Sequence, residues 1–229
     1  MQLIKKTALS IFGTIAPTKF KEYHELRFWK TRPRKEDGTL ANDHYEHFYT
    51  ALFGLTHAWY ENKRILDIGC GPRGSLEWAD MCEERVGLDP LAAQYMKLGA
   101  DKHKMKYADA PSEKIPFRDN YFDVVCAFNS LDHVADYSVT IDEIKRVTKK
   151  GGSFLLIVEV NHPESATEPI SLGWDFLDDF KRGFRVFGEV REYEIGDHDI
   201  YNQIRKEDYY DRRNNVDRPG IVVARLDRI

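Results

Sequence analysis

The stretch from residue 64 to residue 75 constrains the fold of this chain most. It reads RILDIGCGPRGS: a short, mostly apolar run is followed at once by three glycines at G-x-G-x-x-G spacing. Glycines at this spacing permit a tight turn and let the backbone approach a ligand closely. The stretch therefore predicts a strand, a ligand-binding turn and a helix over residues 75–83. By itself, the glycine pattern also fits a dinucleotide-binding fold or an ordinary loop.

Acidic residues end three successive strand-like runs. Asp67 lies at the end of the first run, Asp89 ends the run over residues 85–89, and Asp109 follows the run over residues 105–108. The carboxyl ends of parallel strands share one edge of a sheet, and open α/β folds bind their ligands at that edge. We therefore expect the three carboxylates to lie along one ligand-binding edge, where Asp89 can accept hydrogen bonds from ribose hydroxyls.

Strand-like and helix-like segments alternate through the middle of the chain. The predicted strands cover residues 64–68, 85–89, 104–108, 122–128 and 153–160, and the predicted helices cover residues 75–83, 91–98 and 138–148. Alternating units of this kind predict a parallel sheet with helices on both faces, which is a Rossmann-like, doubly wound α/β fold. The run over residues 154–158 is continuously apolar, as expected for a buried central strand.

The two ends of the chain carry weaker patterns. Apolar side chains over residues 17–30 have helical spacing, and Asp43 fits the N-cap of a second helix. Towards the C-terminus, the patterns predict a helix over residues 171–182 and strands over residues 185–193 and 221–226. Residues 196–218 are charged and rich in tyrosine. They fit either a solvated loop or a segment that shapes an acceptor site through residues such as Tyr201.

Composition limits the class of protein. The chain has 229 residues, 42% of them apolar, which suffices for one large domain with a buried core. A net charge of −4 gives no reason to expect a nucleic-acid partner. Three cysteines without C-x-x-C spacing indicate reduced thiols and a cytoplasmic protein. No apolar run reaches the ~18 residues of a membrane span. Residues 1–16 fit a weak signal peptide less well than an amphipathic segment that packs on the domain or touches a membrane surface.

In their order along the chain, the motifs resemble those of the class I S-adenosylmethionine-dependent methyltransferases, especially the small-molecule branch that includes the quinone-biosynthesis enzymes. The matching segments are LDIGCG at 66–71, GLD at 87–89, ADA at 108–110, IPF at 115–117, FDVV at 122–125 and KKGG at 149–152. The resemblance implies a mostly parallel sheet with an antiparallel last strand. It also implies a helical N-terminal cap over residues 1–60 and a cofactor-binding domain over residues 61–229, with 196–218 as an inserted loop.

The resemblance implies S-adenosyl-L-methionine as the cofactor and assigns part of that molecule to each motif. Asp67 pairs with the ammonium group of the cofactor's amino-acid tail, Asp89 accepts hydrogen bonds from the ribose hydroxyls, and Asp109 binds the adenine. The predicted cofactor-binding residues are Asp67, Gly69, Cys70, Gly71, Gly74, Asp89, Pro90, Asp109, Ala110 and Asn129. For each acid, the alternative is a residue that only caps a turn.

Two histidines are the candidate catalytic residues. Methyl transfer is an in-line displacement, so the protein mainly positions the acceptor and removes its proton. His133 follows the fourth strand and is the first candidate base, although a cap or packing role fits it equally well. His162, with Glu159, stands at the end of the fifth strand as the second candidate. No metal site is predicted, because the one histidine pair on a helical face, at 44 and 47, has no further ligands beside it.

The sequence therefore predicts a methyltransferase that acts on an oxygen, or a nitrogen, of a small-molecule, sugar or lipid-linked acceptor. The fourth strand lacks the Asn/Asp-Pro-Pro-Tyr motif of many enzymes that methylate nucleic acids or protein amides. Two alternatives stay open: an NAD(P)-dependent oxidoreductase, and a methyltransferase fold that binds its cofactor without catalysis. The acid before Gly69, and the lack of a Tyr-x-x-x-Lys pair after the fourth strand, count against the oxidoreductase. No oligomeric state is predicted.

Overall fold

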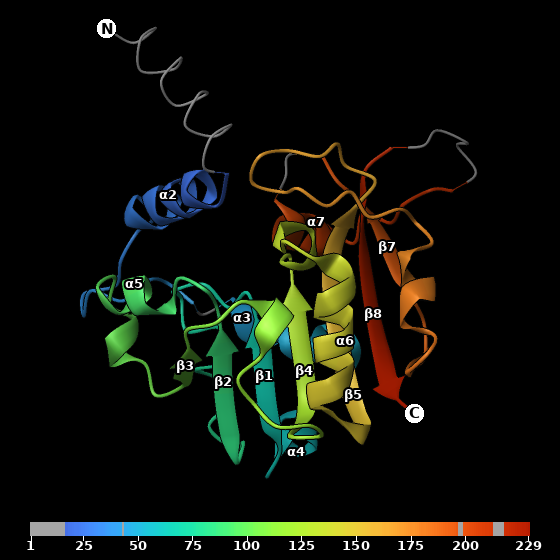
Figure 1. Ribbon diagram of the computed structural model, residues 1–229, viewed down its shortest axis with the longest axis horizontal. Helices are drawn as coiled ribbons and strands as arrows, with labels where there is room; N and C mark the ends of the chain where they lie inside the picture. The colour runs from blue at the N-terminus through green and yellow to red at the C-terminus, as the bar shows by residue number, and fades with distance from the viewer. Residues whose placement is uncertain (1–16, 43, 197–198, 213–217) are drawn as a thin grey trace, which may run out of the picture.

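The computed structural model describes residues 17–42, 44–196, 199–212 and 218–229 (Figure 1). The expectations for residues 1–16, and for Asp43 as a helix cap, lie outside these described residues. In the part of the chain that is described, no helix is both long enough and apolar enough to cross a membrane.

A mixed sheet of eight strands forms the centre of the molecule. Its strands are β1 (Arg64–Ile68), β2 (Glu84–Leu88), β3 (Lys106–Ala108), β4 (Phe122–Phe128), β5 (Thr148–Val160), β6 (Phe184–Val186), β7 (Arg191–Glu194) and β8 (Gly220–Arg228). They lie in the order β3-β2-β1-β4-β5-β8-β6, and β7 also pairs with β8. The first five strands pair in parallel, whereas β8 is antiparallel to each of its partners. This topology confirms the predicted fold class.

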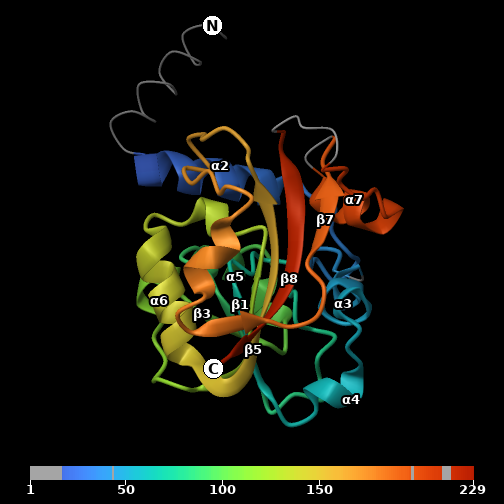
Figure 2. The same cartoon turned by 90° about the vertical axis from the view of Figure 1, so that its right-hand side faces the viewer.

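Helices cover both faces of the sheet and its carboxyl end. The α-helices are α2 (Pro17–Lys30), α3 (Tyr45–Tyr49), α4 (His57–Tyr60), α5 (Ala92–Met96), α6 (Tyr137–Val147) and α7 (Ile200–Lys206). The 3₁₀ helices are η1 (Ala51–Phe53), η2 (Ala100–Lys102), η3 (Ser112–Lys114), η4 (Leu131–His133) and η5 (Phe176–Phe180). Figure 2 shows α6 on one face of the sheet and α3, α4 and α7 on the other. The helix α2 lies across the end towards which β1, β2 and β4 point (Figure 1).

Alternate residues of the central strands supply two hydrophobic cores. In β5, Phe154 and Leu156 belong to the core that contains α6, whereas Leu155 and Ile157 belong to the core that contains α3 and α7. The side chains alternate because successive residues of a strand point to opposite faces of the sheet. Burial on both faces explains the continuously apolar sequence of this strand.

The predicted helix over residues 75–83 is wrong, because the segment forms successive turns. The Arg85 guanidinium donates hydrogen bonds to the carbonyl oxygens of Leu76 and Glu77, at 3.1 and 2.8 Å. These bonds compete with the helical hydrogen bonds that the two oxygens would otherwise accept. The first turn after the glycine loop is therefore fixed by a tertiary contact.

The C-terminal region differs from its prediction in three places. The helix expected over residues 171–182 is reduced to η5. The strand expected over residues 185–193 is divided into β6 and β7 near Gly188, whose φ of 74° lies in the left-handed region. The segment 196–218, expected as a loop, contains α7, which begins after Asp199; that side chain accepts a hydrogen bond from the Asn202 amide.

Candidate active site

The glycine loop follows β1 at the carboxyl end of the sheet. Gly69, Gly71 and Gly74 have φ angles of 71°, 57° and 70°, which favour glycine. A Cβ atom at Gly71 would lie 3.1 Å from the Trp29 ring, and one at Gly74 would lie 2.9 Å from the His103 ring. The loop therefore requires glycine both for its backbone conformation and for the close approach of its neighbours.

Asp67 is buried in β1, directly before this loop. Its Oδ2 atom accepts a hydrogen bond from the Tyr49 hydroxyl at 2.8 Å and another from the Ser75 hydroxyl. Burial raises the pKa of Asp67 to about 7, although the two hydrogen bonds oppose the rise. A carboxyl group with a pKa near neutrality ionises readily when a cationic ligand arrives, and such perturbed groups cluster at functional sites.

Asp89 follows β2 and is hydrogen-bonded to the same loop. Its Oδ2 atom accepts a hydrogen bond from the Gly71 amide at 3.2 Å, and its Oδ1 atom accepts one from the Leu91 amide at 2.9 Å. Burial raises the pKa of Asp89 to about 6, and the negative charge of Glu25 on α2 acts in the same direction. The fold thus brings Asp67, Asp89 and the glycine loop together.

The other predicted residues on this side border the site. Asp109 is exposed, and Ala110 is half-buried against the core that contains α6. The end of β3 is held beside Asp89, whose amide donates a hydrogen bond to the Ala108 carbonyl oxygen at 3.1 Å. Pro90 is exposed next to Asp89. None of these residues belongs to the lining of the cleft that adjoins the glycine loop.

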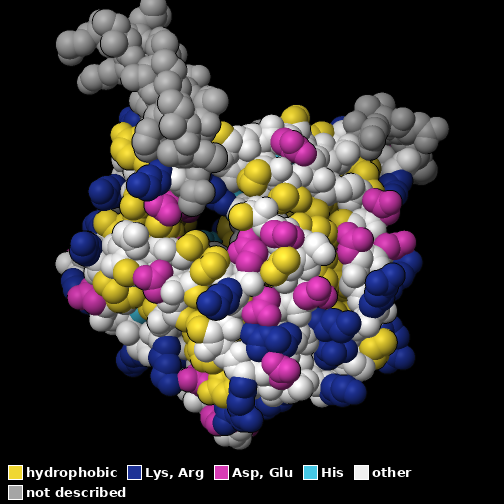
Figure 3. Space-filling model, in the orientation of Figure 1, with side chains coloured by type: hydrophobic (Ala, Val, Ile, Leu, Met, Phe, Trp, Pro, Cys, Tyr) yellow, Lys and Arg dark blue, Asp and Glu magenta, His cyan; other side chains and the backbone are white. Residues whose placement is uncertain are grey.

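A cleft of about 840 Å³ lies between α2 and the carboxyl end of the sheet. Figure 3 shows the surface hollowed there. Its lining comes from α2, from Gly69, Cys70 and Gly71, from the end of β4 and from α7. The volume lies within the ~300–1,000 Å³ that is typical of small-molecule sites. Segments from both ends of the chain therefore enclose a cleft of the size of a small ligand.

Asn129 and His133 line this cleft just after β4. Asn129 has a φ of 52°, and its amide donates a hydrogen bond to the Ile157 carbonyl oxygen at 2.7 Å. Residues held in this sparsely populated conformation concentrate at functional sites. Burial, together with the charge of Lys21, lowers the pKa of His133 to about 4. Its imidazole is therefore neutral near pH 7, and the low pKa makes it a weak proton acceptor.

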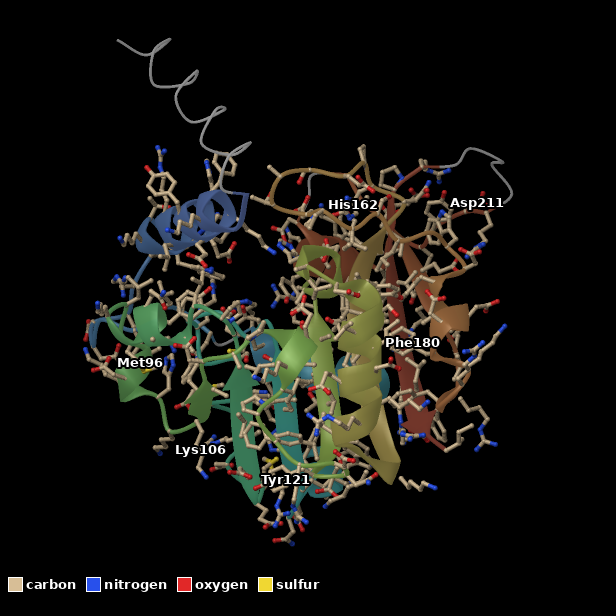
Figure 4. All side chains as sticks on the ribbon, in the orientation of Figure 1. Met96, Lys106, Tyr121, His162, Phe180 and Asp211 are labelled. Carbon is tan, nitrogen blue, oxygen red and sulfur yellow. The ribbon has the colours of Figure 1, made fainter. Side chains whose placement is uncertain are left out.

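His162 lies behind the cleft lining and is joined to His133 through a buried carboxyl group. Figure 4 labels His162 at the carboxyl end of the sheet. The Asp132 Oδ2 atom lies 3.6 Å from His162 Nε2 and 3.9 Å from His133 Nε2, which is also 3.9 Å from Glu168 Oε1. Asp132, His133, His162 and Glu168 are termed the His–Asp cluster below. Glu159, the companion of His162 in the sequence-based prediction, is buried in β5.

Several residues of the site escaped the sequence-based prediction. Tyr49 and Ser75, the partners of Asp67, come from α3 and from the turns after the glycine loop. Trp29 packs on Gly71, and Arg205 of α7 lines the cleft. No local motif marks these contacts, because each joins segments that are far apart in the sequence. The one available signal was the aromatic and charged composition of the two terminal regions.

Comparison with known proteins identifies the central domain. A methyltransferase domain model matches residues 66–156, from β1 into β5. A sterol 4-C-methyltransferase of Caenorhabditis elegans is 35% identical over 42% of this chain and 31% of its own length. A ubiquinone/menaquinone biosynthesis C-methyltransferase of Idiomarina loihiensis is 30% identical over 53% of this chain and 48% of its own length. The chain therefore spans less than half the length of these two relatives.

Solved structures share the fold at lower sequence identity. The N-methyltransferase NodS from Bradyrhizobium japonicum, in complex with S-adenosylhomocysteine, has a TM-score of 0.61 at 13% identity and covers 90% of this chain and 97% of its own. The [4+2]-cyclase SpnF has a TM-score of 0.60 at 16% identity and covers 94% of both chains. The fold and the ordered motifs define a Rossmann-like methyltransferase domain.

Residues 66–156 match a methyltransferase domain, and the similarity to quinone C-methyltransferases supports the predicted resemblance to the class I S-adenosylmethionine-dependent methyltransferases. Methyltransferases of this class use S-adenosylmethionine, so the domain match supports the predicted cofactor. The domain match counts against the alternative of an NAD(P)-dependent oxidoreductase.

Proposed function

We propose that this protein transfers a methyl group from S-adenosylmethionine to a small-molecule acceptor held in the cleft. The observation that carries the proposal is the position of the glycine loop. The loop lines the cleft, is hydrogen-bonded to Asp89 and follows the buried Asp67. His133, whose side chain lines the same cleft, is the first candidate for the proton acceptor.

The predicted binding roles fit this arrangement. In the proposed complex, the amino-acid tail lies along the glycine loop with its ammonium group facing Asp67, and Asp89 accepts the ribose hydroxyls. Asp109 and the Ala110 amide contact the adenine at the border of the site, while Asn129 stands near the sulfonium. The remaining predicted residues shape the loop and its rim: Cys70, Gly74 and Pro90.

The reaction requires the protein to position the acceptor atom and to remove one proton from it. The acceptor atom attacks the methyl carbon and forms the new bond with its own electron pair, while the electrons of the broken carbon–sulfur bond stay on sulfur. The cofactor leaves as S-adenosylhomocysteine. A hydroxyl acceptor loses its proton, for which His133 is the first candidate base and His162 the second.

Two classes of acceptor atom are proposed. The sequence favours an oxygen or a nitrogen. The names of two relatives, which are C-methyltransferases, favour carbon as a second candidate. A ring carbon becomes nucleophilic enough when a neighbouring hydroxyl is ionised, so the same proton acceptor would serve either reaction.

We also propose that residues 1–60 act as a cap on a cofactor-binding domain formed by residues 61–229. Two contacts of α2 support this division: Trp29 packs on Gly71, and the Lys21 ammonium donates a hydrogen bond to the His133 carbonyl oxygen. The helix thus touches both the cofactor side and the acceptor side of the cleft.

Incubation with methyl-labelled S-adenosylmethionine and a panel of quinols, phenols and sugars tests the proposal. We expect a methylated product and S-adenosylhomocysteine in equal amounts. The His133→Ala variant should bind the cofactor normally and react ~100-fold more slowly, as is typical for the loss of a general base. The exposed His47 provides the matched control, His47→Ala. A His133→Ala variant with full activity would rule out the assigned base, and cofactor binding without turnover of any acceptor would favour a non-catalytic role.

A further inference from the structure

We propose that the His–Asp cluster binds one divalent metal ion of the zinc, manganese or cobalt class. Asp132 and His133 come from η4, His162 follows the end of β5, and Glu168 lies in the loop after it. Imidazole nitrogens combined with carboxylate oxygens are a common ligand set for such ions. Because the ligands come from three separate segments, no spacing in the sequence indicates the site.

The ligand atoms converge without forming hydrogen bonds to one another. The three separations of 3.6, 3.9 and 3.9 Å all exceed hydrogen-bonding distance. One ligand atom each from Asp132, His133 and Glu168 lies within 4.8 Å of the other two. Two ligands that are each about 2.1 Å from one ion lie about 3.0 to 4.2 Å apart. Asp132, His133 and Glu168 are therefore close to coordinating distances, whereas His162, which lies near Asp132 alone, joins them only when its ring moves towards the other ligands.

The hydrogen-bond geometry of His162 also favours a cation. Its Nδ1 atom lies 3.0 Å from the Pro163 carbonyl oxygen. A carbonyl oxygen can only accept, so Nδ1 donates, and in the tautomer with this proton alone Nε2 carries a lone pair. This lone pair faces the Asp132 carboxylate, which is itself an acceptor. Two acceptors face one another favourably only with a proton or a cation between them. A backbone carbonyl that fixes one ring nitrogen is also the usual support of a metal-binding histidine.

Burial increases the free-energy cost of leaving these acceptors without a partner. Asp132 and His162 are only 1% and 4% exposed. Their Oδ1 and Nε2 atoms, respectively, have no hydrogen-bond partner among the described residues. Lys21 approaches the cluster from α2, but its ammonium donates to the His133 carbonyl oxygen. One divalent ion would satisfy the carboxylate and the imidazole together, and Glu168 would add a second negative charge.

The binding of the ion stands on these contacts alone, whereas its role rests on the proposed function. His133 and Glu168 line the cleft, so the ion would be open to an acceptor there. A bound cation stabilises an ionised oxygen and lowers the pKa of a hydroxyl that ligates it. His133 would then act through the ion rather than take the proton itself. The favoured acceptors are molecules with an ionisable hydroxyl, such as phenols, quinols and enols.

Titration of the metal-free protein with Co²⁺, followed by visible absorption, tests the site. We expect one Co²⁺ per chain, d–d bands without a thiolate charge-transfer band, and displacement of Co²⁺ by Zn²⁺. Both His162→Gln and Glu168→Gln should weaken Co²⁺ binding at least ~10-fold, whereas His47→Gln should bind like the wild type. Glu168 lies on a partly exposed loop, so its variant still tests the proposal if His162→Gln fails to fold.

Titration of the same samples with S-adenosylmethionine separates this proposal from the proposed function. A wild-type protein that takes up no Co²⁺, or a Glu168→Gln variant that binds it unchanged, would overturn the metal site. A shared proton or a buried water would then join Asp132 to the two histidines. Intact Co²⁺ binding with no affinity for S-adenosylmethionine would overturn the proposed function and leave the metal site standing.

Discussion

Asp67 links the charge of the candidate site to the stability of the fold. Burial raises its pKa from an ordinary value of 3.8 to about 7. Because the folded-state pKa is higher than the unfolded one, the contribution of this group to stability is fully present below about pH 4 and is lost as the pH rises through 7. At neutral pH and above, the cofactor-free protein therefore holds a buried charge that weakens it.

Replacement of Asp67 by asparagine should remove that loss of stability. We expect Asp67→Asn to raise the free energy of unfolding of the cofactor-free protein at about pH 8 by roughly 2 to 4 kcal/mol, since one pKa unit corresponds to about 1.4 kcal/mol. At about pH 4 the effect should be small. Urea unfolding at both pH values measures it, with the exposed Asp101→Asn as control. An equal effect at the two pH values would show that the charge of Asp67 is not the cause.

The same carboxyl group predicts how cofactor affinity depends on pH. An ammonium group binds the ionised form of Asp67, so protonation competes with binding below a pH of about 7. We expect the affinity for S-adenosylmethionine to fall by up to about tenfold per pH unit below that value. Titrations from about pH 5.5 to 8.5 measure the dependence, and an affinity that rises towards low pH would contradict the proposed role of Asp67.

Replacement of Asp89 is the clearest single test of the proposed cofactor contacts. Its carboxylate is proposed to accept both ribose hydroxyls, and it already holds the Gly71 amide in place. We expect Asp89→Ala to weaken S-adenosylmethionine binding ~100-fold or more, because two hydrogen bonds to a charged acceptor and the loop geometry are lost together. Calorimetry against Asp101→Ala checks the result. Unchanged affinity would remove Asp89 from the site.

At the scale of elements, α2 is predicted to act as the cap that retains the cofactor. The Trp29 indole donates a hydrogen bond to Glu25 at 2.7 Å and packs on Gly71. We expect Trp29→Ala to speed the dissociation of S-adenosylmethionine ~10-fold while global stability changes little, because α2 lies at the edge of the fold. Stopped-flow dissociation with the exposed Tyr23→Ala as control measures this. Equal dissociation rates would show that α2 does not cover the ligand.

The strands that build the candidate site were predictable from sequence, and the segments that enclose it were not. Burial on both faces gives β4 and β5 long apolar runs, and the acids at the ends of β1 and β2 mark the carboxyl edge. The turns at 75–83 depend on the Arg85 side chain, which local patterns do not include. The short helix α7 carries only seven residues in a charged segment, so its periodicity is weak. The His–Asp cluster depends wholly on tertiary structure.

At the scale of the whole molecule, the two ends of the chain meet over a common cleft. The helix α2 precedes the sheet in sequence and α7 comes shortly before its last strand, and both line the cleft beside the glycine loop. The domain match over residues 66–156 includes neither helix. The matched domain therefore contains the glycine loop and Asp89, whereas α2 and α7 lie outside the match.

The affinity of the whole protein for S-adenosylmethionine tests the central claim most directly. Calorimetric titration with S-adenosylmethionine, with NAD as a parallel control, is the measurement. The proposed site predicts one S-adenosylmethionine per chain, bound in the micromolar range, and no heat from NAD. Binding of NAD, or of neither molecule at millimolar concentration, would contradict the claim that Asp67, Asp89 and the glycine loop form a cofactor site.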